Sequence, residues 1–188
     1  MRLKMLNLTR SLAIAAGFLV APVAGFAGTP MTYTDGERAL FQIEVPDFWS
    51  VRTGGLRDLT APDAENFRDV SRIFGLTPET HEGIWVGFVS PHGVASLADA
   101  RDYLTDIGQF LVKDAQVETS RSRRIAGLPA QTFSGTGRRG GKPLEFTAIT
   151  IDMPNGRVAV SVVVFEAGSD VDIINDINEM MASFKVVR

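Results

Sequence analysis

The sequence predicts an α+β domain with a single central, mainly antiparallel sheet and helices on both faces, an α/β/α sandwich. Two tight connections, the glycine-rich residues 137–143 and the pair Asn155-Gly156, separate strand-like runs, and consecutive hairpins pair strands antiparallel. Two runs, residues 84–89 and 158–165, are apolar at almost every position, as expected of strands covered on both faces. The predicted covers are two amphipathic helices, one over residues 96–112 and one close to the C-terminus.

Residues 1–27 are predicted to be a secretory signal peptide. An apolar run at 12–23 leads to a small-x-small site at Gly25-Phe26-Ala27, and three basic residues precede or flank it: Arg2, Lys4 and Arg10. The run is shorter than the roughly 20 apolar residues that span a bilayer, although an uncleaved anchor is the alternative. We expect cleavage after Ala27 and a single domain over residues 28–188.

Composition indicates a soluble periplasmic domain. The chain has 188 residues, 45% of them hydrophobic, and no cysteine, which excludes a lipidated cysteine, disulfides and thiolate metal sites. Without residues 1–27 it has 16 Lys and Arg against 22 Asp and Glu, a net charge of −6. This balance argues against nucleic-acid binding, and we expect no stable membrane insertion after cleavage.

The first half of the domain predicts strands around one long excursion. Residues 28–31 are expected to be a frayed start, followed by strands at 32–34 and 39–45 and an extended segment that begins with a core residue, Trp49. Residues 53–83 then form the excursion before the strand at 84–89. Within the excursion, the helical spacing of Phe67, Val70 and Phe74 predicts a helix. This helix is predicted to begin at Pro62 and to end at Gly75.

The second half predicts helix, meander and helix. Ser96 and Asp99 form a capping pair for a helix with this apolar stripe: Leu97, Ala100, Leu104, Ile107 and Leu111. A polar extended run at 117–125 leads into strands at 130–136, 144–152 and 158–165. The last helix, capped by Ser169 and Asp172, has its predicted buried stripe at Ile174, Ile177, Met181 and Phe184.

Three segments resemble the PsbP-like superfamily. They are Phe41-Gln42-Ile43-Glu44-Val45-Pro46-Asp47-Phe48-Trp49, the strand and turn at 125–130, and the closing Ser183-Phe184-Lys185. The resemblance covers nearly all of residues 28–188 and implies the fold of that superfamily. Its members include an extrinsic subunit of photosystem II, a nuclear-import factor that binds a small GTPase, and bacterial exported proteins of unknown role. No binding motif of these relatives matches residue by residue, so no function is carried over.

The sequence contains partial matches to cofactor-binding and metal-binding motifs, but the neighbouring residues do not fit them. Residues 135–140 match the Gly-x-Gly-x-x-Gly fingerprint, but a strand follows where a helix N-terminus must hold the pyrophosphate, so we expect a hairpin and no cofactor. Pro143 stands where a Walker loop needs Ser or Thr. His81 lies near several carboxylates, but a metal needs at least three convergent ligands and the chain has two histidines and no helical pair of them, so no metal site is expected. The chain is therefore predicted not to be an enzyme, although carboxylates paired in space are not visible in a sequence.

Two candidate sites remain. Arg138, Arg139 and Lys142 at a hairpin tip suggest an anion patch, with the arginines of residues 121–124 expected close by and a solvated turn as the alternative. The excursion at 53–83 suggests an interaction segment, with these residues as candidates: Phe67, Arg68, Arg72 and His81.

The expected function is non-enzymatic binding. We expect a periplasmic domain that contacts another envelope protein, with weak contact to an anionic surface as a further possibility. The alternative is a carrier of a small ligand or lipid, with an apolar pocket between the sheet and the helix at 96–112.

Overall fold

The computed structural model describes residues 28–54, 73–81, 83–166 and 171–187. The predicted signal peptide and three candidate interaction residues, Phe67, Arg68 and Arg72, lie outside this part. Among the described residues, no helix is long and apolar enough to cross a membrane.

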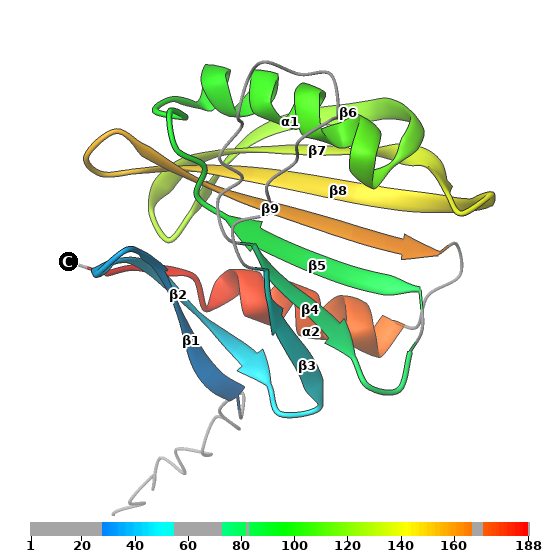
Figure 1. Cartoon of the computed structure of the whole chain (residues 1–188), viewed down its shortest axis with the longest axis horizontal. Helices are drawn as coiled ribbons and strands as arrows, with labels where there is room; N and C mark the ends of the chain where they lie inside the picture. Colours follow the sequence, from blue (N-terminus) through cyan, green and yellow to red (C-terminus); the bar gives the residue numbers. More distant parts are fainter. Residues whose placement is uncertain (1–27, 55–72, 82, 167–170, 188) are drawn as a thin grey trace, which may run out of the picture.

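Antiparallel strands form two sheets (Figure 1). The large sheet has the order β3-β4-β5-β9-β8-β7-β6, and the small sheet has the order β1-β2-β10. The bounds are β1 Gly28–Asp35, β2 Arg38–Pro46, β3 Trp49–Thr53, β4 Phe74–Pro78, β5 Ile84–Val89, β6 Lys113–Ile125, β7 Leu128–Arg139, β8 Lys142–Met153, β9 Arg157–Glu166 and β10 Lys185–Val186. The antiparallel arrangement is confirmed, but the single sheet is wrong, because β1, β2 and β10 pair only with one another.

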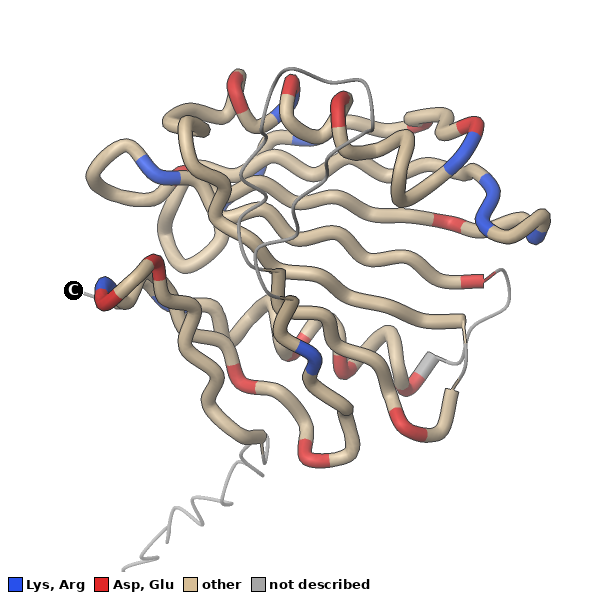
Figure 2. The backbone as a smooth tube through the Cα atoms, in the orientation of Figure 1, with Lys and Arg blue, Asp and Glu red and all other residues tan. Residues whose placement is uncertain are grey.

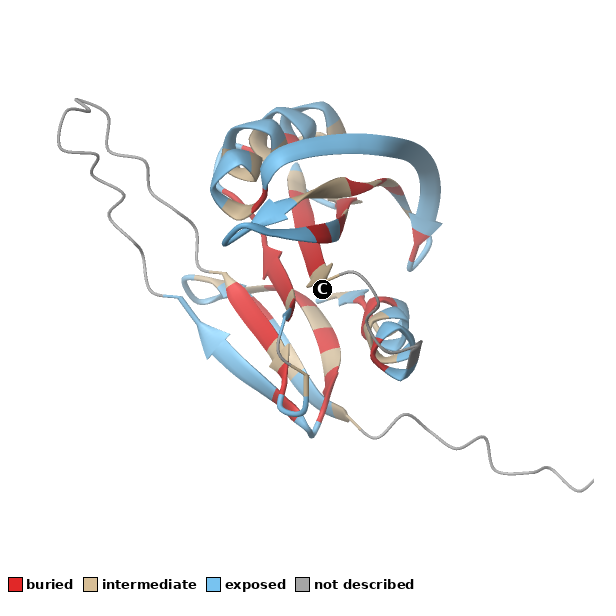
Figure 3. Cartoon of the chain, turned by 90° about the vertical axis from the view of Figure 1, so that its right-hand side faces the viewer, coloured by how far each residue is buried: buried red, intermediate tan, exposed pale blue. Residues whose placement is uncertain are grey.

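Buried side chains form two clusters, and neighbouring residues of one strand belong to different clusters. On β8, Phe146 belongs to a cluster that also receives Leu104 of helix α1, which spans Leu97–Leu111. The other cluster contains Ile149 of β8, Met180 of helix α2 and Phe41 of the small sheet. Helix α2 spans Val171–Ala182. This alternation explains why β9 is apolar at nearly every position, and Figure 3 shows the buried residues concentrated along these strands.

Helix α1 begins as the sequence predicts. The Ser96 hydroxyl accepts a hydrogen bond from the backbone N–H of Asp99 at 3.1 Å. The Asp99 carboxylate accepts one from the N–H of Ala95, also at 3.1 Å. Hydrogen bonding of this carboxylate to the Ser96 side chain and to the Ala95 N–H lowers the pKa of Asp99. The capping pair is therefore confirmed.

The predicted stripe of α2 is partly wrong. Ile174 is 39% exposed, whereas Ile173 and Met180 are buried beside the predicted Met181 and Phe184. The buried side is shifted by one residue, because α2 packs against both the large sheet and β2 and takes its orientation from those contacts.

Two N-terminal predictions are corrected. Residues 28–31 are not frayed, because the whole of β1 pairs with β2 from Gly28 onward. Phe74 and Gly75 do not end a helix but begin β4, where the strand pairs with β3 on one side and β5 on the other. Trp49 is buried, as predicted, with 4% of its surface exposed.

Candidate functional site

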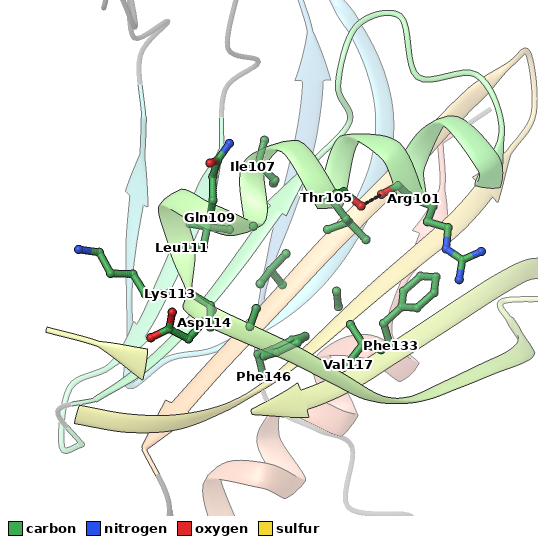
Figure 4. Close-up of a pocket in the computed structure, with 16 residues that line it drawn as sticks. Arg101, Thr105, Ile107, Gln109, Leu111, Lys113, Asp114, Val117, Phe133 and Phe146 are labelled. Carbon is green, nitrogen blue, oxygen red and sulfur yellow. Dashed lines mark hydrogen bonds between the residues drawn. The ribbon is translucent and has the colours of Figure 1, made fainter. Parts of the chain in front are cut away.

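A cavity of about 580 Å³ lies between helix α1, the first residues of β6 and the large sheet (Figure 4). Its floor is apolar and buried, formed by Phe133, Phe146, Ala148 and Val162. Leu104, Ile107, Leu111 and Val112 cover it from the helix and its C-terminal end, with Gly108 among them. Its remaining lining is Arg101, Thr105, Gln109, Lys113, Asp114, Ala115 and Val117. A cavity is therefore present where the carrier alternative placed a pocket.

The cavity exists because α1 packs loosely on the sheet. Within α1, only Ala100 is fully buried, and Leu104, Ile107 and Leu111 of the predicted stripe are half-buried. Gly108 contributes no side chain, and a Cβ placed there would meet no atom within 4 Å. The predicted apolar stripe does face the sheet, but Leu104, Ile107 and Leu111 of that stripe lie over the cavity.

Strand β6 is irregular at the same place. Every residue of β6 except Ile125 is exposed, and its pairing with β7 shifts register between Lys113 and Gln116 and between Val117 and Thr119. Bulges of this kind bend a strand and increase its twist. Figure 3 shows β6 as a broad exposed arch beside α1.

Two glycines of β7 let this bulged segment approach. A Cβ at Gly135 would lie 1.9 Å from the carbonyl oxygen of Gln116, and one at Gly137 would lie 2.2 Å from Cγ1 of Val112. Two further glycines, Gly140 and Gly141, have φ of +57° and +85° and form the turn into β8. The hairpin predicted for this glycine-rich run is therefore confirmed.

The two ends of the cavity carry charge. The Arg101 guanidinium lies 5.7 Å from the centroid of the Phe133 ring, within the range of a cation–π contact. Lys113 lies at the other end, next in sequence to Asp114, which also lines the cavity. Figure 4 shows Arg101 beside Phe133 and the Lys113–Asp114 pair at opposite ends of the lining.

The other polar side chains of the lining have partners in the helix backbone. The Thr105 hydroxyl donates to the Arg101 carbonyl at 3.0 Å, and the Gln109 amide donates to the Asp106 carbonyl at 3.0 Å. On another part of α1, burial raises the pKa of Tyr103 to about 12, so its hydroxyl stays protonated at neutral pH. Within the described residues, no group of three His, Asp or Glu side chains is arranged to hold a metal ion.

The structure places the predicted anion patch at the β7–β8 turn, where Figure 2 shows several cations. Two of the three cations are engaged: Arg138 donates to the Gly141 carbonyl at 3.0 Å, and Lys142 pairs with Glu166 at 3.0 Å. Arg139 and Lys142 line a second cavity, of about 310 Å³.

The arginines of residues 121–124 do not join this patch. Arg138 pairs in register with Lys113, whereas Arg121 pairs with Thr132. Thr132 and Arg138 are six residues apart on β7, which is about 20 Å at 3.3 Å per residue. The expectation that the two groups lie close together is wrong, because they occupy opposite ends of the β6–β7 ladder.

Of the predicted interaction residues, only His81 is described. Its Nδ1 lies 2.8 Å from the Thr80 hydroxyl in the connection between β4 and β5. The excursion is shorter than predicted, because β4 occupies residues 74–78. Its ends meet: the Gly54 N–H donates to the Ile73 carbonyl at 3.0 Å.

No protein-family model matches the sequence, and no curated protein matches it significantly. Among solved structures, the cyanobacterial PsbP of Synechocystis sp. PCC 6803 matches over 91% of this chain and 100% of its own, at 13% identity and a TM-score of 0.51. The fold is PsbP-like. LpqN of Mycobacterium tuberculosis, involved in cell envelope biogenesis, matches this PsbP-like domain over 88% of each chain, at 14% identity and a TM-score of 0.51.

Sequence reasoning identified the pocket's two walls but missed what opens it. Gly108 and the bulges of β6 carry no signal that distinguishes them from an ordinary helix glycine and an ordinary polar strand. The available signal was the mostly polar run from Lys113 to Arg124, followed by the closely spaced Gly135 and Gly137.

Proposed function

We propose that this domain is an exported, non-enzymatic binding protein that holds a small, largely apolar molecule in the cavity under α1. The observation that carries the proposal is the cavity of about 580 Å³ with a buried floor of Phe133, Phe146, Ala148 and Val162. Cavities that bind small molecules have volumes of about 300–1,000 Å³, mostly apolar linings and a few polar groups. The periplasm is the proposed compartment, supported by the signal-like residues 1–27 and the net negative charge of the remainder.

The proposal takes α1 and α2 as outer layers on opposite faces of the large sheet. Phe146 and Val162 contribute to the cavity under α1, whereas Ile149 and Val163 line a smaller cavity beside α2. Neighbouring residues of a strand point to opposite faces, so these two linings imply one helix on each side. The helix over the larger cavity is the one with the looser packing.

Burial of apolar surface supplies the binding energy. Each methylene transferred from water gains about 0.8 kcal/mol, so about ten methylenes gain about 8 kcal/mol before the cost of association is subtracted. The half-buried Leu104, Ile107 and Leu111 lose further contact with water when the cavity fills. A ligand therefore completes packing that the chain alone leaves unfinished.

The test uses an uncharged fluorescent probe, N-phenyl-1-naphthylamine, titrated into the purified mature domain. We expect saturable binding that Gly108→Phe abolishes, because a side chain at this position has room to enter the cavity. Gly108→Ala is the matched control and should keep binding. Equal binding by both variants, each with an intact thermal transition, would rule out this cavity as the site.

Contact with another envelope protein is a second proposal. Its support is the outer strand β3 and the turn before it, which expose Val51 at 37% and Phe48 at 48%. The paired ends at Gly54 and Ile73 allow residues 56–71 to be replaced by a short Gly-Ser linker without breaking β3–β4. If the excursion is the docking segment, this replacement abolishes capture of the partner. If β3 is the docking segment, the double variant Phe48→Ser with Val51→Ser abolishes it.

A further inference from the structure

The cavity runs along α1 as an elongated space. Its helical lining extends from Arg101 to Leu111, ten helical steps, which is about 15 Å at 1.5 Å per residue. Its volume of about 580 Å³ corresponds to roughly 19 groups of the size of a water molecule, at about 30 Å³ each. A lining of this length accommodates an extended hydrocarbon chain.

Between its ends the cavity offers a bound molecule no ionised partner. Floor and helix contribute aliphatic and aromatic side chains, and the intervening Thr105 and Gln109 already donate to backbone carbonyls. Charge enters the lining only at Arg101, Lys113 and Asp114. A ligand that satisfies this lining is apolar along its length and polar at one end.

The two ends differ in net charge. Lys113 is adjacent to Asp114, so the positive and negative charges at that end offset each other. Arg101 has no acidic residue three or four positions away on α1, where the neighbours are Leu97, Ala98, Leu104 and Thr105. No carboxylate of the described residues forms an ion pair with it. Asp102, which follows Arg101 in sequence, does not line the cavity, whereas Asp114 does, so within the lining the Arg101 end is positive and the Lys113 end is balanced.

Arg101 lies beside the cavity floor. Its guanidinium is 5.7 Å from the centroid of Phe133, a floor residue that is 7% exposed, which is within the range of a cation–π contact. Arg101 is itself exposed, so its N–H donors are accessible, and a guanidinium can donate two hydrogen bonds at once to a carboxylate or phosphate.

We propose that the ligand is a single-chain amphiphile with an anionic headgroup, that Arg101 binds the headgroup, and that the chain extends along α1 toward Lys113. This inference rests on the proposed function, because it names the class of molecule that occupies the same cavity. Carboxylate and phosphate headgroups share the required chemistry.

Four probes with the same chain length test the proposal: dodecanoate, dodecyl phosphate, dodecanol and dodecylammonium, each below its micelle concentration. Competition against N-phenyl-1-naphthylamine is measured at low and moderate salt. We expect at least one anion to displace the dye at a concentration about tenfold lower than dodecanol, with dodecylammonium weakest. The stronger anion identifies the headgroup as carboxylate or phosphate.

Variants assign the headgroup to one end. Arg101→Gln should reduce the advantage of the anion over dodecanol to less than twofold while dodecanol binding is unchanged, and Arg101→Lys should restore part of it. Lys113→Gln tests the opposite assignment, and Lys185→Gln, outside the cavity lining, is the matched control that should keep the full advantage. If Lys113→Gln removes the advantage and Arg101→Gln does not, the assignment to Arg101 is wrong.

The outcomes separate this inference from the proposed function. Dye binding that Gly108→Phe blocks, together with equal affinity for anion and alcohol, overturns the inference and leaves the apolar binding function standing. Preference for dodecylammonium overturns it as well. Absence of binding of the dye and of all four probes, measured directly, overturns both.

Discussion

The contact between Arg157 and Asp35 ties the two sheets together, and its removal should destabilise the domain. Arg157, the first residue of β9, donates to the Asp35 carboxylate at the end of β1 and to the carbonyl of Ser90 at 3.0 Å. Their side chains are 17% and 26% exposed, so water replaces these bonds only in part. Hydrogen bonds to charged groups contribute about 1.5–3 kcal/mol each, and with partial solvation we expect Arg157→Met to cost about 2 kcal/mol. This corresponds to a fall in melting temperature of about 4–8 °C for a domain of this size.

The same contact makes stability depend on pH in a defined direction. The hydrogen bond from Arg157 lowers the pKa of Asp35 below 3.8, with smaller contributions from the charges of His92, Arg157 and Arg38 and an opposing effect of burial. A carboxyl group whose pKa is lower in the folded state contributes stability above its unfolded pKa and loses it as the pH falls through the folded pKa. The difference in melting temperature between the wild type and Asp35→Asn should therefore shrink as the pH falls below about pH 4.

Thermal denaturation followed by circular dichroism between pH 3 and pH 7 measures this difference. Lys142→Met is the control, because the Lys142–Glu166 pair is 70% and 46% exposed and should change the melting temperature within error. A difference for Asp35→Asn that stays the same from pH 7 to pH 3 would refute the reasoning, because it would show that the contact stabilises by packing and not by charge.

Three further predictions concern the cavity and the hairpin. Gly108→Ala should stabilise the domain by about 0.5–1 kcal/mol, because it raises helix propensity and its Cβ meets no atom within 4 Å; a lower melting temperature would contradict this. Gly135→Ala should destabilise it by about 2 kcal/mol in urea unfolding, because the new Cβ collides with the Gln116 carbonyl. Arg139→Glu with Lys142→Glu should weaken binding to anionic vesicles at low salt if the hairpin tip contacts such a surface, and unchanged binding would exclude it.

The parts of the fold that the sequence predicts well are those that depend on neighbours in the chain. The β8–β9 turn follows from Asn155-Gly156, both of which have positive φ, and the start of α1 follows from Ser96 and Asp99. The position of β5 in the interior of the large sheet follows from a run of apolar residues that needs cover on both faces. Each of these signals is complete within a few residues.

The parts that were predicted wrongly depend on distant partners. The segment from Phe74 has helical spacing with Phe67 and Val70, yet it forms β4 because Phe74 and Leu76 find paired, buried places between β3 and β5. The register of α2 and the separation of β1, β2 and β10 into their own sheet are likewise set by packing against elements far away in sequence. No local pattern distinguishes these outcomes from the ones we expected.

The close spacing of Gly135 and Gly137 can be explained either by a nucleotide-binding motif or by close contact with another part of the chain. Read along the chain, they form part of a nucleotide-binding fingerprint, because glycine is required wherever another backbone or a phosphate approaches closely. In the structure the approaching group is the chain itself: Gln116 and Val112 lie where the Cβ atoms would be. That approach holds the bulged start of β6 across β7, beside the C-terminal end of α1, and the cavity opens next to it. The glycines therefore shape the wall of the cavity in which we propose that an apolar ligand binds.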